Sequence, residues 1–558
     1  MQVMLDSAQC VLVQLFHILI VRLKGNTNSN EKLMSKLEQV NSTDIADAIR
    51  LGCRTMQNVF NADDNQVPFF GSTVRPKAAL SFSAHHSESH VPGRHLNALL
   101  NAEDAADVEL DEDAVKNHRR AALLSYSGPV ALPLNRQTIG GLPVNFSPHN
   151  LREGFHALYA LARYRNDDEA CKLAEQSIAA VFDLWSPDRG WDVQRLGTLG
   201  LHYRKNQNFL NGEARMLGPL VKYYHATRYG PALELALILK EKTIREFFLP
   251  DGAFDPKRFG TSHVHSITCV LSSLAQLADL LGDGSLATRV KAFYDNGLWN
   301  MRDEIGWSPE TVVQQDSDHG EANNTGDILE TALILGRWGY SECYHDAERI
   351  LRCHLLPSQL RDTSFIKTPP NPDGVDGLRD VANRHLGAYG FPAPYGHESA
   401  DKGRGNISFN MDIVGGTVGS LCEAYREMVR SESTGHWVNL LFDHETSAIR
   451  VQSPYTHDCL RVKLGQSGPL FVRIPPWVNR DEVNVEGNST LPIWTNGYLF
   501  FSKVSAGQAI ELHFPLKEVQ ITLSERLHIH PIRVKMRGDA VVSMDNFNAG
   551  LTFFDRYE

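Results

Sequence analysis

The sequence predicts a mainly helical protein with a β domain: an (α/α)6 toroid followed by a C-terminal antiparallel β-sandwich. Residues 44–432 contain about twelve apolar stretches of helical period, joined by polar or Gly/Pro-rich connectors. In several consecutive pairs the first stretch is richer in small and apolar residues and the second in charge, which favours six inner helices ringed by six outer ones. From residue 433 to residue 558 the apolar period becomes that of β-strands.

The predicted helices follow one another along the first part of the chain. They are IADAIRLGCRTMQNVF, GRHLNALLNAEDAA, DAVKNHRRAALLSY, NLREGFHALYALARYR, EACKLAEQSIAAVFDLW, GEARMLGPLVKYYHATR, ALELALILKEKTIREFF, HVHSITCVLSSLAQLADLL, SLATRVKAFYDNGLW, GDILETALILGRWGY, HDAERILRCHLL and DIVGGTVGSLCEAYREMV. A solenoid of helical pairs is the competing arrangement. No common repeat motif is visible, and this favours the toroid.

Strand signals fill the C-terminal part. LRVKL (460–464) and AIELHF (509–514) alternate at period two, as half-buried antiparallel strands do. The number of such short runs suits a β-sandwich. We expect the last 30 or so residues either to add edge strands or to pack back on the toroid.

The composition and the net charge exclude some classes of binding partner. The chain has 558 residues and a net charge of −11, so a nucleic-acid partner or an anionic membrane surface is not expected. Its eight cysteines are scattered without a CxxC pair, which indicates neither a zinc knuckle nor a disulfide framework. A carbohydrate partner fits better, and the sequence leaves open whether the chain forms a homodimer.

The N-terminal sequence is typical of a leader segment. An apolar run there is interrupted by Gln14 and His17, and its basic residues follow rather than precede it, which is a poor signal peptide. The run is also short and broken for a membrane span. We therefore expect residues 1–43 to be a dispensable helix or a disordered leader, and the protein to be cytoplasmic.

Three long polar connectors are the places where chemistry is expected, because a packed toroid needs only short turns between helices. They cover residues 82–95 (FSAHHSESHVPGRH), 308–330 (SPETVVQQDSDHGEANNTGDILE) and 368–412. Carboxylates, histidines and amides are dense in them, and a glycosidic site needs such groups to transfer protons and hold hydroxyls. The catalytic candidates are Glu321, Glu330, Asp318 and Asp412.

Simpler interpretations compete for some of these residues. Asp327 and Glu330 stand three apart at the start of an apolar helix, where acidic residues also stabilise the helix dipole, and Asp327 suits an N-cap. The histidines between His85 and His95 could hold a metal, but Pro92 argues against the helix that would align them. We expect no metal there and assign hydrogen bonding or stacking with substrate to His265, His319, His90, Tyr389, Tyr395 and Asn410.

Several of these segments resemble glycoside hydrolase family 127, the β-L-arabinofuranosidase group. HVHSITCVLSSLAQLADLLGD is similar to a helix of that family and places His265 on its substrate-contacting histidine. GDILETALIL resembles the helix that carries the family's conserved glutamate, here Glu330, and Glu321 matches its upstream acid/base glutamate more loosely. LFVRIPPWV and NGYLFF resemble strands of its C-terminal sandwich, so the likeness spans residues 80–520.

This sequence lacks the cysteines on which the chemistry of that family depends. That family binds zinc through the glutamate and three cysteines, one of which is the nucleophile. Here the corresponding positions hold Ala332, Phe409 and Asn410, so the sequence predicts neither zinc nor any other cofactor. If the protein is a glycosidase, carboxylates remain: Glu321 with Glu330 or Asp318, across from Asp412.

Three functions stay open from the sequence. The first is a metal-independent glycoside hydrolase that acts on the terminal sugar of an oligosaccharide or glycoside. The second is a polysaccharide lyase or uronyl-processing enzyme, in which His90 or Tyr389 would be the base and Arg94 or Arg404 the neutraliser. The third is a carbohydrate-binding homologue without catalysis.

Overall fold

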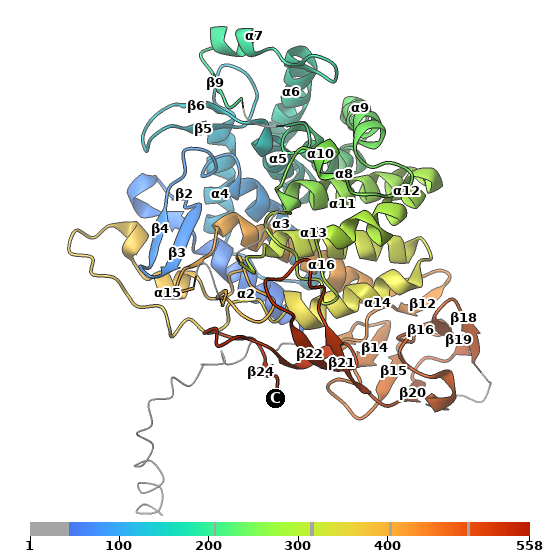
Figure 1. The fold of residues 1–558 in the computed structure, drawn as a ribbon. Helices are drawn as coiled ribbons and strands as arrows, with labels where there is room; N and C mark the ends of the chain where they lie inside the picture. Colours follow the sequence, from blue (N-terminus) through green and yellow to red (C-terminus); the bar gives the residue numbers. More distant parts are fainter. Residues whose placement is uncertain (1–43, 206–207, 313–316, 401–403, 488–491) are drawn as a thin grey trace, which may run out of the picture. The chain divides into compact units, whose positions relative to one another are not determined.

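Six helices of the chain form a closed inner ring, which distinguishes a toroid from a solenoid. The computed structural model describes residues 44–205, 208–312, 317–400, 404–487 and 492–558 (Figure 1). Each inner helix packs against the next, and the last packs against the first. These helices are α3 (Val91–Ala106), α5 (Leu151–Arg165), α8 (Leu217–Thr227), α11 (Val264–Leu281), α13 (Ala322–Arg337) and α16 (Met411–Met428). The predicted (α/α)6 toroid is confirmed. The predicted leader, 1–43, lies outside the described residues.

Outer helices alternate with the inner ones along the chain, and each packs on an inner neighbour. Aspartate caps several of their N-termini by accepting backbone N–H groups, as Asp44, Asp111, Asp167 and Asp283 do. Their exposed faces carry the charge that the sequence shows. They are α2 (Ile45–Gln57), α4 (Glu112–Ser125), α6 (Asp168–Leu184), α9 (Gly230–Glu246), α12 (Gly284–Asp295) and α14 (Ser341–Ile350).

Helix α11 is long and apolar enough to cross a membrane by length and composition alone. However, 78% of that stretch is buried inside the protein, as an inner helix of the ring must be.

Short strands that the helical periodicity does not predict precede three inner helices. The sheet β10-β3-β4 comprises β3 (Gly71–Arg75), β4 (Ala79–Ser81) and β10 (Ile407–Ser408), the last directly before α16. In the sheet β5-β6-β9, β5 and β6 precede α5 in the chain and β9 follows α6. Its strands, and the other short elements of the toroid, are β5 (Leu134–Arg136), β6 (Pro143–Phe146), β9 (His202–Tyr203), β1 (Phe60–Asn61), β2 (Val67–Pro68), β7 (Trp185–Ser186), β8 (Gly190–Trp191), α7 (Val193–Thr198), α10 (Pro256–Phe259) and α15 (Val381–Arg384).

The β-sandwich consists of two five-stranded sheets around an apolar core of their own. In β15 the buried and exposed residues alternate, as its LRVKL pattern predicts. All pairs are antiparallel except β12 with β16. One sheet is β11 (Val429–Glu432), β12 (Gly435–Val438), β16 (Gly468–Arg473), β19 (Tyr498–Val504) and β18 (Ile493–Thr495); the other is β13 (His444–Glu445), β14 (Ile449–Gln452), β15 (Leu460–Leu464), β20 (Ala509–His513) and β17 (Asn484–Glu486).

The end of the chain forms a further four-stranded sheet, with β21 (Glu518–Thr522), β22 (Arg533–Arg537), β23 (Ala540–Met544) and β24 (Asp555–Arg556). Its apolar side chains, such as Val534 and Met536, belong to the core of the toroid and not to that of the sandwich. The range 433–558 predicted as one sandwich therefore contains two parts, and the second packs back on the toroid.

Candidate active site

Polar side chains gather where the N-terminal ends of the inner helices meet, here called the mouth of the ring. Each of five inner helices contributes at or next to its first turn, and a 3-10 turn before α8 supplies Arg215. Helix N-termini carry partial positive charge and so favour the carboxylates found there. The residues are His90, Arg94, Arg152, Glu153, Arg215, His263, His265, Glu321, Asp327 and Asp412.

Glu153 is the centre of this arrangement. Its Oε1 lies 2.8 Å from Arg215 Nη2, 3.2 Å from Arg94 Nη2 and 3.2 Å from Arg152 Nη1. Its Oε2 lies 3.4 Å from His90 Nδ1. Burial alone would raise the pKa of Glu153, but the surrounding His90 and arginine charges hold it well below its ordinary value. Glu153 is thus a buried carboxylate that stays ionised and holds three guanidinium groups together.

Asp412 forms a second carboxylate site on the first turn of α16. Its Oδ2 lies 3.2 Å from His90 Nε2 and 3.4 Å from Arg94 Nε. Its other oxygen, Oδ1, is buried and has no hydrogen-bond partner among the described residues. Burial would raise the pKa of Asp412, yet Arg94 and the histidines hold it well below its usual range. Asp412 therefore offers an ionised oxygen with spare hydrogen-bonding capacity.

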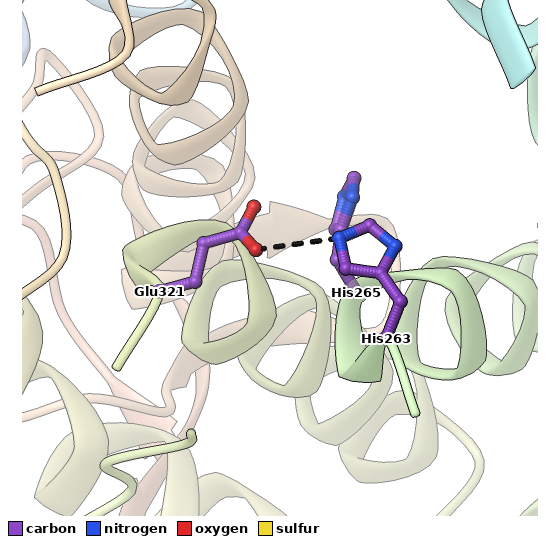
Figure 2. Close-up of side chains that lie close together, drawn as sticks. All are labelled: His263, His265 and Glu321. Atoms are coloured by element: carbon purple, nitrogen blue, oxygen red, sulfur yellow. Dashed lines mark ion pairs between the residues drawn. The ribbon is translucent and has the colours of Figure 1, made fainter. Parts of the chain in front are cut away.

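Glu321 and two histidines form a third group (Figure 2). Glu321 is the N-cap residue of α13, and its Oε2 lies 3.6 Å from His263 Nε2. Asn323 Nδ2 donates to Glu321 Oε1 at 3.0 Å, and His263 Nδ1 pairs with Ser266 Oγ at 2.9 Å. Figure 2 shows His265 beside His263 at the start of α11, with their ring centroids 5.8 Å apart. Glu321 is thus a carboxylate whose position and orientation are fixed.

His265 connects the three groups. Its Nδ1 lies 3.4 Å from Arg94 Nη2, and Arg94 also contacts Asp412. Its Nε2 lies 3.4 Å from Asp327 Oδ2, which accepts from Thr268 Oγ1 at 2.9 Å. Burial, and then the nearby arginines, keep the pKa of His265 well below its ordinary value, so the imidazole is neutral at neutral pH. Burial raises the pKa of Asp327 to about 7.

Histidine rings also line the rim of the mouth. His149 stacks on His90 with centroids 5.5 Å apart, and His86 lies 5.1 Å from His90. His86 and His90 both reach Asn150 Oδ1, at 3.3 and 3.0 Å. Helix α3 begins only at Val91, so His86 and His90 do not share a helix, and a hydrogen-bonded turn before α3 brings their rings together.

Glycine lets the inner helices approach closely enough to build the network. A Cβ on Gly93 would lie 1.8 Å from the backbone oxygen of Glu153, and one on Gly416 would lie 2.0 Å from Asn323 Oδ1 and 2.7 Å from Arg94 Nη1. Any other residue at Gly93 would push α3 away from the backbone of α5, and any other residue at Gly416 would displace the Asn323 and Arg94 side chains.

Glu330, in contrast, lies far from the mouth. Helix α13 begins at Ala322, so nine residues, or about 13 Å of helix, separate Glu330 from Glu321. Glu330 accepts from Ser272 and Ser420 at 2.9 Å each, and lines a cavity of about 330 Å³ towards the C-terminal ends of the inner helices. The predicted pairing of Glu321 with Glu330 is therefore not formed. Asp327 is not an N-cap either, since it stands in the second turn.

Asp318 and Tyr395 are buried together in another place. Tyr395 donates to Asp318 Oδ2 at 3.3 Å, and Asp318 Oδ1 lies 3.2 Å from His528 Nδ1. His528 Nε2 lies 3.2 Å from Asp303 Oδ2. The result is a buried ion cluster that joins the C-terminal sheet segment to the toroid, and Asp318 has its charge compensated there.

This ion cluster predicts a pH-dependent stability. Burial would lower the pKa of His528, but Asp303 and Asp318 raise it to about 9 from the ordinary 6.5. Because the pKa of His528 is higher in the folded than in the unfolded protein, its protonation stabilises the fold. This contribution is fully present below pH 6.5 and is lost as the pH rises through 9. We expect the free energy of unfolding in urea to fall by roughly 2–3 kcal/mol from this group over that range. A D303N/D318N/H528Q variant should lack this fall, and parallel profiles for variant and wild type would contradict it.

The remaining predicted binding residues have different surroundings. His319 is half-exposed, stacks on Phe391 with centroids 4.8 Å apart, and lies 3.3 Å from Glu310. Because Val264 donates to the Glu310 carbonyl, this pair lies near His263 at the mouth. Asn410 is the N-cap residue of α16, two positions before Asp412. Tyr389 is fully buried, so a stacking contact between its ring and a sugar is not expected.

Two groups at the mouth bring together residue types that bind metals: His263 with His265 and Glu321, and His265 with Cys269 and Asp327. Neither contains more than one cysteine. The zinc ligands that the family resemblance implies fall on Ala332, Phe409 and Asn410, of which Ala332 and Phe409 are buried and apolar. These side chains do not fit a thiolate zinc centre.

Sequence reasoning missed Glu153, Arg152, Arg215 and His149 as parts of the mouth. Glu153 stands in LREGFHAL, where an acidic residue in a first turn is read as dipole stabilisation. The neighbouring arginine on what is predicted to be an inner helix was the available signal, because a buried charge requires a buried partner.

The fold and the mouth together define a helical toroid with a convergent polar site at one end. No protein-family model and no curated protein matches the sequence. Among solved structures, the chain is similar to a GH127 beta-L-arabinofuranosidase from Geobacillus stearothermophilus T6, with 14% identity, a TM-score of 0.53, and 89% of this chain and 80% of that chain covered.

Two further structures show the same likeness. A second GH127 beta-arabinofuranosidase has 14% identity and a TM-score of 0.53 over 91% of this chain and 83% of its own. A structure described as a glycoside hydrolase has 12% identity and a TM-score of 0.51 over 87% and 84%. At these identities the comparisons establish a shared fold, that of a helical toroid with a C-terminal β domain.

Proposed function

We propose that the protein is a glycoside hydrolase that releases the terminal sugar of an oligosaccharide or glycoside at the mouth of the ring. One observation carries the proposal: Glu321 and Asp412 lie at the N-terminal ends of the neighbouring helices α13 and α16, connected through Arg94, His265 and His263. Carboxyl pairs that face one glycosidic bond perform its hydrolysis in most glycosidase families. The shared fold with structures named as glycoside hydrolases supports the proposal.

The surroundings of the two carboxyl groups suggest different roles. Asp412 is held ionised by Arg94 and His90, which suits a group that attacks the anomeric carbon or activates water. Glu321 lies beside His263, whose side chain is partly exposed, and there it would exchange a proton with the glycosidic oxygen. Neutral His265, held between Arg94 and Asp327, would orient Arg94 beside Asp412.

The proposal uses no zinc and no cysteine nucleophile. Ala332, Phe409 and Asn410 supply no thiolate at the positions that the family resemblance names. The nearest buried thiol, Cys269, has its pKa raised to about 11 by burial, so it is protonated at neutral pH and is a weak nucleophile.

The lyase alternative receives less support from the mouth. A lyase needs a cation that is free to neutralise a uronate carboxylate. Arg94, Arg152 and Arg215 all bind Glu153, Arg94 also contacts Asp412 and Arg152 also contacts Asp327, so these three carboxyl groups offset the arginine charge within the protein. A neutral sugar therefore fits this site better than a uronate.

A panel of nitrophenyl glycosides tests the proposal. We expect the wild-type protein to release nitrophenol from at least one member, and Asp412→Asn to slow that release by about 10²-fold or more. Calorimetry of sugar binding and the ultraviolet absorption of unsaturated uronates should be followed in parallel. Sugar binding without turnover would support the non-catalytic alternative, and formation of an unsaturated uronate the lyase, and either result would overturn the proposal.

A further inference from the structure

The outward face of one sandwich sheet brings a cysteine, a histidine and a glutamate together, far in sequence from every residue of the mouth. Strand β20 pairs antiparallel with β15, with Leu460 opposite Leu512 and Arg461 opposite Glu511. By the same register Cys459, one residue before β15, stands beside His513, the last residue of β20. Glu511 follows two residues away on the same face of β20.

Side-chain direction confirms this placement. Leu460 and Leu512 are fully buried in the sandwich core, so their neighbours Cys459, Glu511 and His513 project from the opposite face. One ligand atom from each of these three residues lies within 4.8 Å of the other two. A rigid antiparallel ladder thus holds a thiol, an imidazole and a carboxylate together.

Two of these groups have unused binding capacity that points into the cluster. His513 Nε2 is shielded from solvent and has no hydrogen-bond partner among the described residues, although it lies 3.7 Å from Glu511 Oε2. Glu511 Oε1 is occupied by Arg461 Nη2 at 2.9 Å, which leaves Oε2 on the side of the histidine. A bound ion at this point would supply the partner that His513 Nε2 lacks among the described residues.

We propose that Cys459, His513 and Glu511 bind a zinc ion on the sandwich. Thiolate, imidazole and carboxylate are the three ligand types that zinc accepts in tetrahedral sites, and a water molecule would complete the set. Calcium and magnesium prefer oxygen ligands alone and do not suit it. On binding, the Cys459 thiol loses its proton to solvent and the sulfur forms the bond to zinc, while Arg461 continues to orient Glu511.

The geometry requires only local adjustment. Zinc–ligand bonds of about 2.0–2.3 Å place neighbouring ligand atoms roughly 3.5 Å apart, so the side chains must close by about 1 Å. His513 is half-exposed at the end of its strand and is free to make that movement. The histidine group at the mouth is less suited to a cation, since Arg94 and Arg215 lie 3.4 and 3.5 Å from His265 Nδ1.

Cobalt substitution of the full chain tests the site. We expect the protein, stripped of metal, to bind one Co²⁺ with a thiolate-to-cobalt charge-transfer band in the near ultraviolet, and Zn²⁺ to displace it. Cys459→Ser should abolish the band, and His513→Gln should weaken Zn²⁺ binding at least about 10-fold. Zn²⁺ should also raise the Tm of the wild type but not that of Cys459→Ser.

Two control variants test whether the cobalt band comes from Cys459 and not from another cysteine or from the mouth. Cys171→Ser replaces a partly exposed cysteine elsewhere in the chain, and His263→Gln removes a histidine of the mouth. Both should retain the cobalt band. A band that survives Cys459→Ser, or that disappears in either control, would overturn the proposal, as would the absence of any cobalt band in the wild type. Because the site lies outside the mouth, glycosidase activity and metal binding can fail independently.

Discussion

A Glu153→Gln variant is expected to lose about 3–5 kcal/mol of unfolding free energy, the cost of removing one partner from a buried ionic network. Its carboxylate binds Arg94, Arg152 and Arg215 in a site closed to solvent. Glutamine keeps the size of the side chain but leaves three guanidinium groups without their shared counter-charge. Urea denaturation followed by circular dichroism measures the loss.

Glu169→Gln is the matched control for this variant. Glu169 pairs with Arg119 at 2.8 Å on the surface of α6, where salt bridges contribute less than about 1 kcal/mol. If Glu153→Gln and Glu169→Gln had equal effects, the mouth would not depend on Glu153 as its central counter-ion.

Glu321→Gln is expected to lower kcat/KM by about 10²–10⁴-fold on whichever glycoside the panel identifies, the usual contribution of a positioned acid or base. The variant should stay folded, because Glu321 caps the start of α13 without a side-chain bond to the helix backbone. KM should change little, since the amide still accepts from Asn323. Steady-state kinetics and the pH profile of kcat/KM measure this effect.

Glu330→Gln provides the control on the same helix and with the same chemical change. Glu330 is about 13 Å further along α13 and, within the described part of the chain, accepts hydrogen bonds from Ser272, Ser420 and Gln276. We expect its kcat/KM to stay within about threefold of the wild type. A large loss in Glu330→Gln together with a small one in Glu321→Gln would move the reaction away from the mouth.

Much of the fold is predictable from the sequence, because an inner helix of a closed ring is buried nearly all round and an outer helix on one face only. That contrast is visible in pairs such as α11 and α12. The strands of two to four residues before α5 and α16 are too short to leave a periodic pattern. The strands after Phe514 have the same sequence pattern as those of the sandwich. Only the three-dimensional packing shows that they lie against the toroid.

The site was partly predictable for a related reason. Glu321 and Asp412 follow polar connectors and stand at helix starts, so the sequence marks them as candidates. Glu330 was grouped with them because ANNTG looks like a loop, whereas those residues form the buried first turns of α13. Glu153 has Arg152 beside it as a local signal, but its role also depends on Arg94 and Arg215, which are distant in sequence.

The axis of the ring is lined by polar residues along much of its length, and this affects which amino-acid substitutions the fold tolerates. Between the mouth and the deeper cavity the lining includes Arg94, Arg152, His156, Asp327 and Glu330, around a void of about 20 Å³, room for one water molecule. The dry packing that holds the toroid together lies instead in the layer between inner and outer helices. Polar residues on the axis can therefore be substituted together, with their charges still balanced, without disturbing the packing between inner and outer helices. The fold can thus be kept while the chemistry of the axis changes.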